Sequence, residues 1–341
     1  MKLVTFEVST PVGPFARIGA LTDADAAIWD INFCVARSLA LGGRNAPLER
    51  ADLDAPADMI GFLGLGSAAT DLAADAIGRA GEADATVWEG RRLRYATSEV
   101  RILAPVPRPP TIRDFLMVKE HVENSFARLP ADKRPPHSIA DMARAPGHWK
   151  GNPRNVFGPG AEIPYPSYTD EFDYELELAV VIGRPGRDIS VDQAPEHIAG
   201  YTIFNDWSAR DIQMEEMKVG LGPALGKDFA FSIGPCIRTA DGFDPVTAVM
   251  TAAVDGVEWS RGTIGDMLRS FPELVSWVSR AQELQPGDII GGGTIANGCG
   301  LELGRYVPPG SVVELAVDGI GRLENRVSAK PESSNPSWHR G

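Results

Sequence analysis

Beyond residue 106 the chain consists mainly of short runs rich in β-branched residues, each closed by Gly, Asp or Pro. Runs of this kind predict strands separated by turns. They fall at residues 174–183, 198–206, 249–262, 287–294 and 311–327. Strands do not alternate with helices here, and the glycine-rich stretches 61–67 and 291–294 lack the strand–loop–helix setting of a phosphate-binding loop. The pattern therefore excludes a doubly wound parallel sheet and predicts a mixed, β-rich α+β fold.

Helical patterns are fewer than strand patterns. Beyond residue 106 we expect helices at 111–124, 209–217 and 264–281, the last from apolar positions that recur with a 3.6-residue period. In the first hundred residues, strand-like runs at 3–8, 16–21 and 87–93 accompany helical patterns near 30–40 and 68–80.

A proline-rich stretch, 103–114, divides the chain. Prolines fix φ and remove a backbone donor, so this stretch predicts a linker. We expect a small β-rich N-terminal domain over 1–106, a larger domain over 107–328, and a flexible polar tail over 329–341.

Charge and composition limit the partners. The net charge of −13 argues against a nucleic-acid or anionic-membrane partner, since no basic stripe is present. No apolar run approaches the roughly 18 residues of a membrane span, and the N-terminus resembles a strand rather than a signal peptide. Cys34, Cys236 and Cys299 are few, odd in number and without metal-ligand spacing. A reducing cytoplasm is the compartment that this pattern favours.

Two carboxylates stand out on the run 174–183. Glu175 and Glu177 share one face of a strand, about 7 Å apart. An exposed strand would explain them, but the run continues with apolar residues on both faces, which is typical of a buried strand. Two buried like charges raise each other's pKa unless a cation neutralises them. The pair therefore predicts a metal site, and oxygen ligation favours Mg²⁺, with Mn²⁺ or Ca²⁺ as alternatives.

The segment "NDWSARDIQ" extends this hypothesis. Asp206 closes the strand-like run 198–206 and offers a third carboxylate. Arg210 lies one helical turn beyond it, and Gln213 follows three residues later on the same helix face. The segment is expected to form one wall of a charged site.

Three segments, "DYELELAVVIG", "NDWSARDIQ" and "LGPALGKDF", resemble the fumarylacetoacetate hydrolase family in order and spacing. The resemblance runs from about Thr111 to Val327. It implies a catalytic β-roll, preceded in full-length members by a small β-rich N-terminal domain, and it implies a homodimer.

The resemblance also implies roles for individual residues. Glu175, Glu177 and Asp206 match metal ligands, and in "DFLMVKEH" Asp114 matches the fourth, seven residues before the catalytic His121. In "GTIANGCGLELGR" a turn that starts at Thr294 leads to Glu302, which matches the Glu that orients the His. Thr294 and Trp149 match substrate contacts, and the residues that match groups for oxyanion stabilisation and substrate binding are Lys227, Gln213 and Arg210. Trp149 replaces the Tyr that the family commonly has.

The implied activity is metal-dependent hydrolysis of a C–C bond in a 2,4-diketo acid of the fumarylacetoacetate or acylpyruvate type. His121 would activate water, and Glu302 would orient the imidazole of His121. The alternative is a decarboxylase or enol–keto isomerase acting on oxaloacetate-like or 2-hydroxy-diene acids. Those reactions need no water-activating pair, so the presence of both residues favours hydrolysis. A non-enzymic binding protein is a third possibility, against which Lys227 and Gln213 argue.

Overall fold

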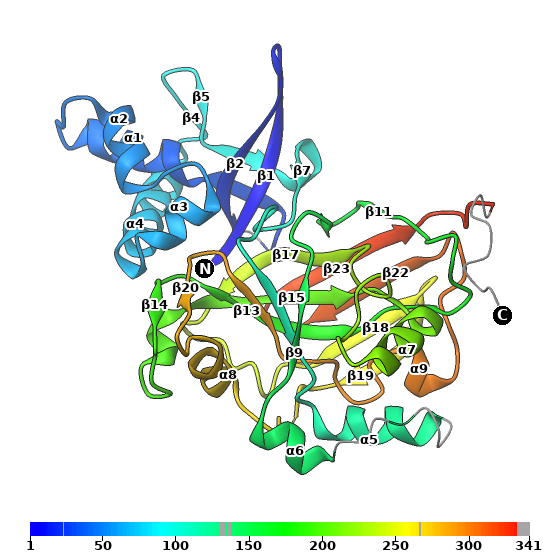
Figure 1. Cartoon of the computed structure of the whole chain (residues 1–341). Helices are drawn as coiled ribbons and strands as arrows, with labels where there is room; N and C mark the ends of the chain where they lie inside the picture. Colours follow the sequence, from blue (N-terminus) through cyan, green and yellow to red (C-terminus); the bar gives the residue numbers. More distant parts are fainter. Residues whose placement is uncertain (23, 130–133, 135–137, 266, 333–341) are drawn as a thin grey trace.

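The computed structural model describes residues 1–22, 24–129, 134, 138–265 and 267–332 (Figure 1). The longer strands are β1 (Lys2–Thr10), β2 (Gly13–Thr22), β3 (Ala27–Asp30), β8 (Ile112–Phe115), β9 (His148–Gly151), β13 (Leu176–Ile182), β15 (Ile198–Asp206), β17 (Phe231–Thr239), β18 (Met250–Val254), β19 (Val257–Gly262), β22 (Val312–Val317) and β23 (Gly321–Val327). The shorter strands are β4 (Val87–Trp88), β5 (Arg91–Arg92), β6 (Arg94–Ala96), β7 (Arg101–Ile102), β10 (Val156–Phe157), β11 (Glu162–Ile163), β12 (Phe172–Asp173), β14 (Gly186–Arg187), β16 (Ser208–Ala209), β20 (Glu283–Leu284) and β21 (Ile289–Gly291). The helices are α1 (Ile31–Leu41), α2 (Pro47–Asp54), α3 (Met59–Gly64), α4 (Ser67–Glu82), α5 (Lys119–Arg128), α6 (Ile139–Arg144), α7 (Arg210–Val219), α8 (Phe271–Val278) and α9 (Gly300–Leu303).

Two sheets contain most of the strands. Within the described residues, a 12-stranded sheet follows the order β6-β3-β2-β1-β17-β15-β13-β21-β8-β9, with β7 attached to β1 and β10 to β17. A 5-stranded sheet follows the order β11-β23-β22-β18-β19. Most pairs are antiparallel, whereas β21 and β8 run parallel. The predicted β-rich α+β class is therefore confirmed.

Strand β13 shows why its sequence folds this way. Leu176, Leu178 and Val180 point to one face and join the core that contains the inner residues of the second sheet. Ala179 and Val181 alternate with them and join a core on the opposite face. Both sets are completely buried, as expected for a central strand covered on both sides. The alternation places Glu177 on the same face as Ala179.

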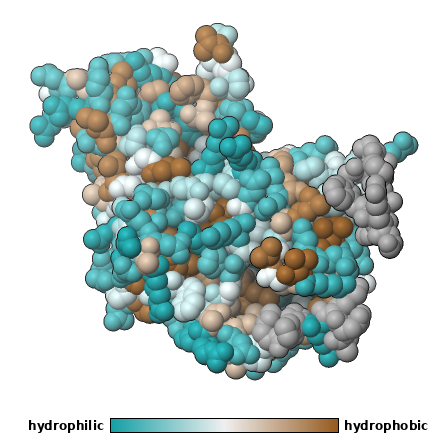
Figure 2. All heavy atoms as spheres, in the orientation of Figure 1, coloured by the Kyte–Doolittle hydropathy of each residue, from teal (hydrophilic) through white to brown (hydrophobic). Residues whose placement is uncertain are grey.

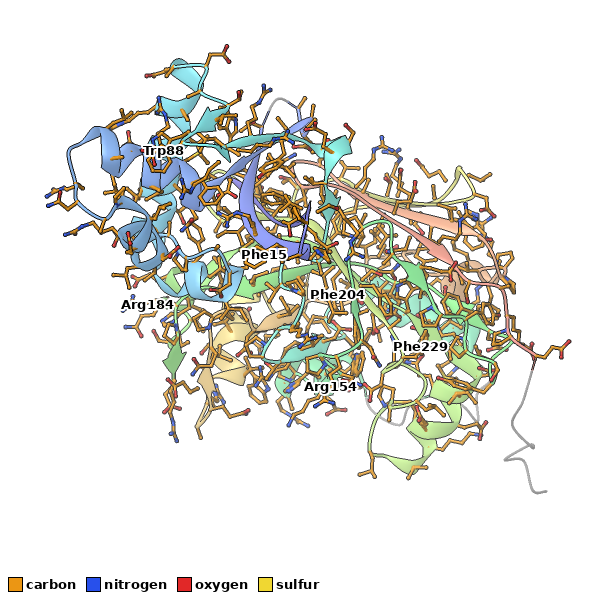
Figure 3. All side chains as sticks on the ribbon, turned by 90° about the horizontal axis from the view of Figure 1, so that it is seen from above. Phe15, Trp88, Arg154, Arg184, Phe204 and Phe229 are labelled. Carbon is orange, nitrogen blue, oxygen red and sulfur yellow. The ribbon has the colours of Figure 1, made fainter. Side chains whose placement is uncertain are left out.

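The N-terminal region continues the main sheet instead of standing apart from it. Strand β1 pairs with β17, and Leu3 lies opposite Ile237. Helices α1 to α4 gather beside β1 and β2 at the upper left of Figure 1, and their apolar faces share one core with Val181 and Phe204. From above, Phe204 lies toward the middle of the molecule and Arg184 at its edge (Figure 3). A division into domains at residue 106 therefore remains a proposal about folding units.

Two expected helices differ in the structure. The segment 111–124 forms β8 before α5 begins, because residues 112–115 pair with both β21 and β9. Tertiary pairing here overrides a helical pattern. Among the described residues of 264–281 the helix is confined to α8, where Ser270 and Glu273 form a capping box and Pro272 lies in the first turn.

Other expectations fared differently. Helices α1, α4 and α7 lie where they were predicted, whereas α2 and α3 were not predicted. Residues 333–341 of the predicted tail lie outside the described residues. No helix in the described part of the chain has both the length and the apolar character needed to cross a membrane.

Leu3→Ala tests whether the shared sheet makes the chain one folding unit. Leu3 is 1% exposed, so the change should cost about 2–5 kcal/mol and should lower a single unfolding transition that is monitored by circular dichroism and tryptophan fluorescence. Figure 2 shows a hydrophobic tip where Figure 1 draws the β1–β2 hairpin. Val12→Ala, between these two strands and 97% exposed, is the control and should change little. A separate early transition, with the remainder unchanged, would instead favour an independent domain at 1–106.

Candidate active site

Four buried carboxylates converge at one end of the main sheet. Asp114 lies on β8, Glu177 on β13 and Asp206 at the end of β15, while Glu175 directly precedes β13. Each offers an oxygen that lies within 4.8 Å of the others. Strands β15, β13, β21 and β8 are consecutive neighbours, which brings together residues that are far apart in the sequence.

Gly291 on β21 makes room for this cluster. It is paired with Asp114 on one side and with Ala179 on the other. A Cβ at this position would lie 2.1 Å from Asp114 Oδ1 and 3.2 Å from Glu177 Oε2. A residue with any side chain would therefore displace the carboxylates.

Two buried cations contact one side of the cluster. The Lys227 ammonium lies 2.6 Å from Glu175 Oε2 and 2.5 Å from Asp206 Oδ2. Arg210 Nη2 lies 2.8 Å from Glu175 Oε1. Burial alone would raise the pKa of Glu175, but Arg210 and Lys227 outweigh it and hold that pKa below its usual range. For Asp206 the burial outweighs Lys227, and its pKa is well above the usual range.

The other side of the cluster lacks such compensation. Burial raises the pKa of Asp114 to about 6. Burial, and then the charges of Asp114 and Glu175, raise the pKa of Glu177 well above normal. Glu177 nevertheless accepts hydrogen bonds from the Gly293 backbone at 3.1 Å and from the Thr294 hydroxyl at 3.0 Å. These bonds fix its carboxylate but do not neutralise it.

The cluster fits a hard divalent cation. Asp114 Oδ1 and Asp206 Oδ1 are buried without any hydrogen-bond partner, which is costly unless another ligand occupies them. An oxygen-only donor set is the kind that Mg²⁺, Mn²⁺ and Ca²⁺ prefer. The four predicted ligands are thus brought together in an arrangement suited to that role.

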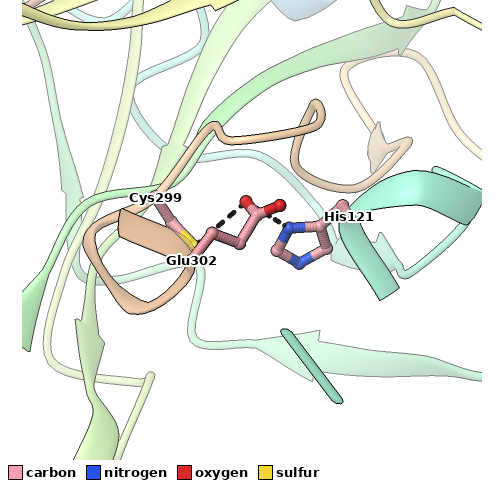
Figure 4. Close-up of side chains that lie close together, drawn as sticks. All are labelled: His121, Cys299 and Glu302. Atoms are coloured by element: carbon pink, nitrogen blue, oxygen red, sulfur yellow. Dashed lines mark hydrogen bonds and ion pairs between the residues drawn. The ribbon is translucent and has the colours of Figure 1, made fainter. Parts of the chain in front are cut away.

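His121, Cys299 and Glu302 form a second buried group (Figure 4). His121 on α5 and Glu302 on α9 are each 3% exposed, and His121 Nδ1 lies 2.8 Å from Glu302 Oε2. The backbone amides of Asn297 and Gly298 donate to the Glu302 carboxylate at 2.8 and 3.0 Å, and Asn124 donates at 3.2 Å. A carboxylate held in this way fixes the imidazole, so that Nε2 is the nitrogen able to accept a proton.

The turn that carries Glu302 is attached to the strand that carries the carboxylates. Glu175 pairs with Cys299 in an isolated bridge, and the Leu176 amide donates to the Gly298 carbonyl at 3.0 Å. The Cys299 thiol points toward Glu302, 3.5 Å from Oε2. Burial raises the pKa of this thiol well above its usual value, so it stays neutral. The pair formed by His121 and Glu302 is therefore built onto the same strand end as the carboxylate cluster.

A cavity of about 500 Å³ opens onto the cluster. Of the predicted site residues, its lining includes Asp114, Trp149, Glu175, Glu177, Gln213, Lys227 and Thr294. The Trp149 indole donates to Asp114 Oδ2 at 3.3 Å, so it braces a carboxylate as well as forming a wall. His121, Glu302 and Arg210 are buried and are not among the residues that line the cavity.

Arg210 therefore sits deeper than the predicted role of substrate contact suggests. Its guanidinium bonds Asp173 at 2.8 Å and Gln213 Oε1 at 3.1 Å, as well as Glu175. Because Gln213 accepts through Oε1, its amide NH₂ remains the end that can donate to a ligand. A direct contact between Arg210 and substrate stays a prediction.

Sequence reasoning missed Asp173. This completely buried carboxylate binds Arg210 and also accepts the Gly300 and Leu301 amides, at 2.7 and 3.0 Å, where α9 begins. It thereby links the cation beside the cluster to the helix that carries Glu302. The signal was available, because residues 173, 175 and 177 are spaced by two, as on one face of a strand.

Glu216 on α7 was also missed. Its carboxylate accepts three consecutive backbone amides, those of Ala224, Leu225 and Gly226, at 2.9, 2.8 and 3.0 Å. These bonds tie α7 to the loop that ends at Lys227. A half-buried glutamate on a helix gives no sequence signal for such a contact.

Comparisons with known proteins agree on one family. The model for the fumarylacetoacetate (FAA) hydrolase C-terminal domain matches residues 111–328. The oxaloacetate tautomerase YisK of Bacillus subtilis is 30% identical over 236 residues, which are 68% of this chain and 75% of that protein.

Solved structures give the same result for the fold. The fumarylacetoacetate hydrolase of Exiguobacterium antarcticum aligns with a TM-score of 0.66 at 26% identity, over 96% of this chain and 99% of that one. A maleylpyruvate hydrolase of Sphingobium, solved with manganese and pyruvate, aligns with a TM-score of 0.66 at 22% identity over 97% of this chain and 100% of that one. The second likeness concerns the fold alone.

Asp206→Asn and Glu175→Gln test the cation site. Each removes a charge but keeps the shape, so Mg²⁺ affinity measured by calorimetry should fall by roughly 10–100-fold or more while the protein stays folded. Glu215→Gln, an exposed change on α7, is the control and should bind Mg²⁺ normally. Unchanged affinity in both cluster variants would contradict the assignment.

The raised pKa of Asp114 predicts how pH affects stabilisation by metal. The pKa of Asp114 is higher in the folded protein than in the unfolded chain, where it is about 4. This carboxyl therefore contributes stability below about pH 4, and that stability is lost as the pH rises through about 6. A cation restores that loss only where the carboxyl is ionised. The gain in melting temperature on adding Mg²⁺ should therefore be larger at about pH 7.5 than at about pH 5. Asp114→Asn should flatten this difference, and a pH-independent gain in the wild type would refute the prediction.

Proposed function

The chain belongs to the fumarylacetoacetate hydrolase family, and on that premise we propose that it hydrolyses a C–C bond in a 2,4-diketo acid. The observation that carries this proposal is the buried pair of His121 and Glu302 beside four carboxylates. Such a pair is suited to removing a proton from water, and the cluster is suited to a cation that binds the diketo acid. We further propose, from the family resemblance, a homodimer in the cytoplasm.

The cation would be Mg²⁺, with Mn²⁺ or Ca²⁺ as alternatives, and when bound it would polarise the oxygens of the 2-oxo acid. The residues that would hold it are Asp114, Glu175, Glu177 and Asp206. Trp149 and Thr294 would keep Asp114 and Glu177 in position through the hydrogen bonds described above.

His121 would act on water. Nε2 takes one proton from a water molecule, and the remaining hydroxide forms a bond to the carbonyl carbon at position 4 of the substrate. Glu302 stabilises the imidazolium that results. When the bond between carbons 3 and 4 breaks, its electron pair leaves with the pyruvate fragment as an enolate. Carbon 3 of that fragment then takes up a proton, so that one water yields pyruvate and a carboxylic acid.

Lys227 and Gln213 would stabilise the negative oxygen that forms at carbon 4. An ammonium group has three hydrogens, and two of those on Lys227 point to Glu175 and Asp206. The third remains for the substrate. Gln213 would present its NH₂, because Arg210 occupies its oxygen. Donors that are fixed before the reaction are the most effective kind, since they need no reorganisation.

A second candidate is oxaloacetate tautomerisation or decarboxylation. The observation in its favour is the 30% identity to an oxaloacetate tautomerase over 68% of the chain. Tautomerisation would use the same buried groups, with His121 moving a proton between carbon 3 and the 2-oxygen. It would need no water, and this is the difference that an experiment can detect.

His121→Ala separates the two candidates when hydrolysis of an acylpyruvate and decarboxylation of oxaloacetate are followed in parallel. Loss of a positioned base should reduce hydrolysis by about 10²–10⁴-fold. Decarboxylation needs only electron withdrawal at the carbonyl, so its rate should fall much less than the rate of hydrolysis. Glu302→Gln should act in the same direction but more weakly, because it loosens the imidazole without removing it.

Equal losses on both substrates would mean that His121 does not activate water. If the wild-type enzyme tautomerises oxaloacetate but leaves every 2,4-diketo acid intact, the second candidate function would be favoured over hydrolysis.

A further inference from the structure

The cavity of about 500 Å³ has two chemically different parts. One end holds the carboxylates together with Lys227, Gln213 and Thr294. The rest of its wall is mainly apolar and comes from β8, β9, α6, α7 and the loop after α7. Its large apolar side chains are Phe115, Leu116, Met142, Trp149, Met217 and Pro223, and Asp141, Arg144 and His148 also line the cavity.

Within the part of the chain that the structure describes, the apolar part offers no spare cation for a second carboxylate. Among the described residues that line the cavity, Lys227 and Arg144 are the cationic side chains. Lys227 already contacts Glu175 and Asp206. Arg144 bonds Asp141 at 2.8 Å on the same helix, and its side chain is 79% exposed.

His148, also in the lining, adds no positive charge near neutral pH. Burial first, and then Arg113 and Lys150, lower its pKa to about 4.

The size of the cavity points the same way. Pockets of roughly 300–1,000 Å³ enclose ligands much larger than a four-carbon acid. Oxaloacetate bound through its 2-oxo acid end would leave most of the apolar wall in contact with water. A longer, apolar acyl group would cover that wall and release the water from it.

We infer that the substrate is a 2,4-diketo acid whose acyl group is apolar, alkyl or aryl, and carries no second carboxylate. This rests on the proposed function for the reacting end of the substrate. A carboxylate in the apolar part would lose its hydration without gaining a partner, which disfavours it. Met217 on α7, 40% exposed and part of the wall, is a residue through which the chain selects the tail.

The matched probes are 2-oxohexanoate and 2-oxoadipate, which differ only in a terminal methyl against a terminal carboxylate. Binding to the full chain is measured by calorimetry at saturating Mg²⁺. The monocarboxylate should bind roughly tenfold more tightly or better, the scale on which one group in an apolar pocket discriminates. Arg144→Gln should leave the ratio unchanged. Equal or tighter binding of 2-oxoadipate, or a selective loss of it in Arg144→Gln, would overturn the inference.

Met217→Lys should reverse the preference, because it places a cation in the apolar wall. Val219→Lys is its matched control, since it adds the same charge to the same helix at a residue that is 73% exposed and outside the lining. That control should keep the wild-type ratio. A reversal in both variants, or in neither, would show that the wall around Met217 does not select the tail.

Turnover of the corresponding 2,4-dioxo acids separates the two proposals. Preferential binding of 2-oxohexanoate without hydrolysis of either dioxo acid would refute the hydrolase and leave the apolar pocket standing. Hydrolysis of both at equal kcat/KM would support the hydrolase and refute the apolar preference.

Discussion

Repulsion among four buried carboxylates is the constraint on which the rest of this structure depends. Lys227 and Arg210 neutralise one side of the cluster, around Glu175, and leave Asp114 and Glu177 with raised pKa values. Two unpartnered oxygens remain, those of Asp114 and Asp206. Such an arrangement is unfavourable for an empty protein and favourable around a cation, so the stability of the site and its chemistry are linked through one equilibrium.

The main sheet is what makes this concentration of charge possible. Adjacent strands hold the carboxylates at fixed spacings, and Gly291 leaves the space between them open. The sheet also holds the pair of His121 and Glu302, because Cys299 bridges to Glu175 just ahead of the helix that carries Glu302. Asp173 completes the connection by binding both Arg210 and the start of that helix. A change at any of these positions would therefore disturb both parts of the site.

Alternation on a buried strand is a local signal, and it allowed Glu175 and Glu177 to be predicted from the residues alone. The contact between His121 and Glu302 joins positions 181 residues apart and came only from the family resemblance. Asp114 was placed on a helix because residues 111–124 have a helical pattern, whereas pairing with β21 and β9 makes its segment a strand. Glu216 and the joining of β1 to β17 have no local signal, since both depend on partners chosen by the whole fold.

On the proposed function, chemistry and substrate choice would be carried by different parts of the molecule. The carboxylates lie on or beside adjacent strands, and His121 and Glu302 lie on helices α5 and α9. Small changes there would disturb the proposed reaction. The apolar wall comes largely from the short helix α6, from α7 and from the loop held by Glu216. Side chains there, such as Met142 and Met217, have no polar partners to lose and can change without disturbing the carboxylates. On this proposal, family members would share one reacting end and still act on different acids, in agreement with the resemblance of this chain to relatives named for oxaloacetate and for fumarylacetoacetate.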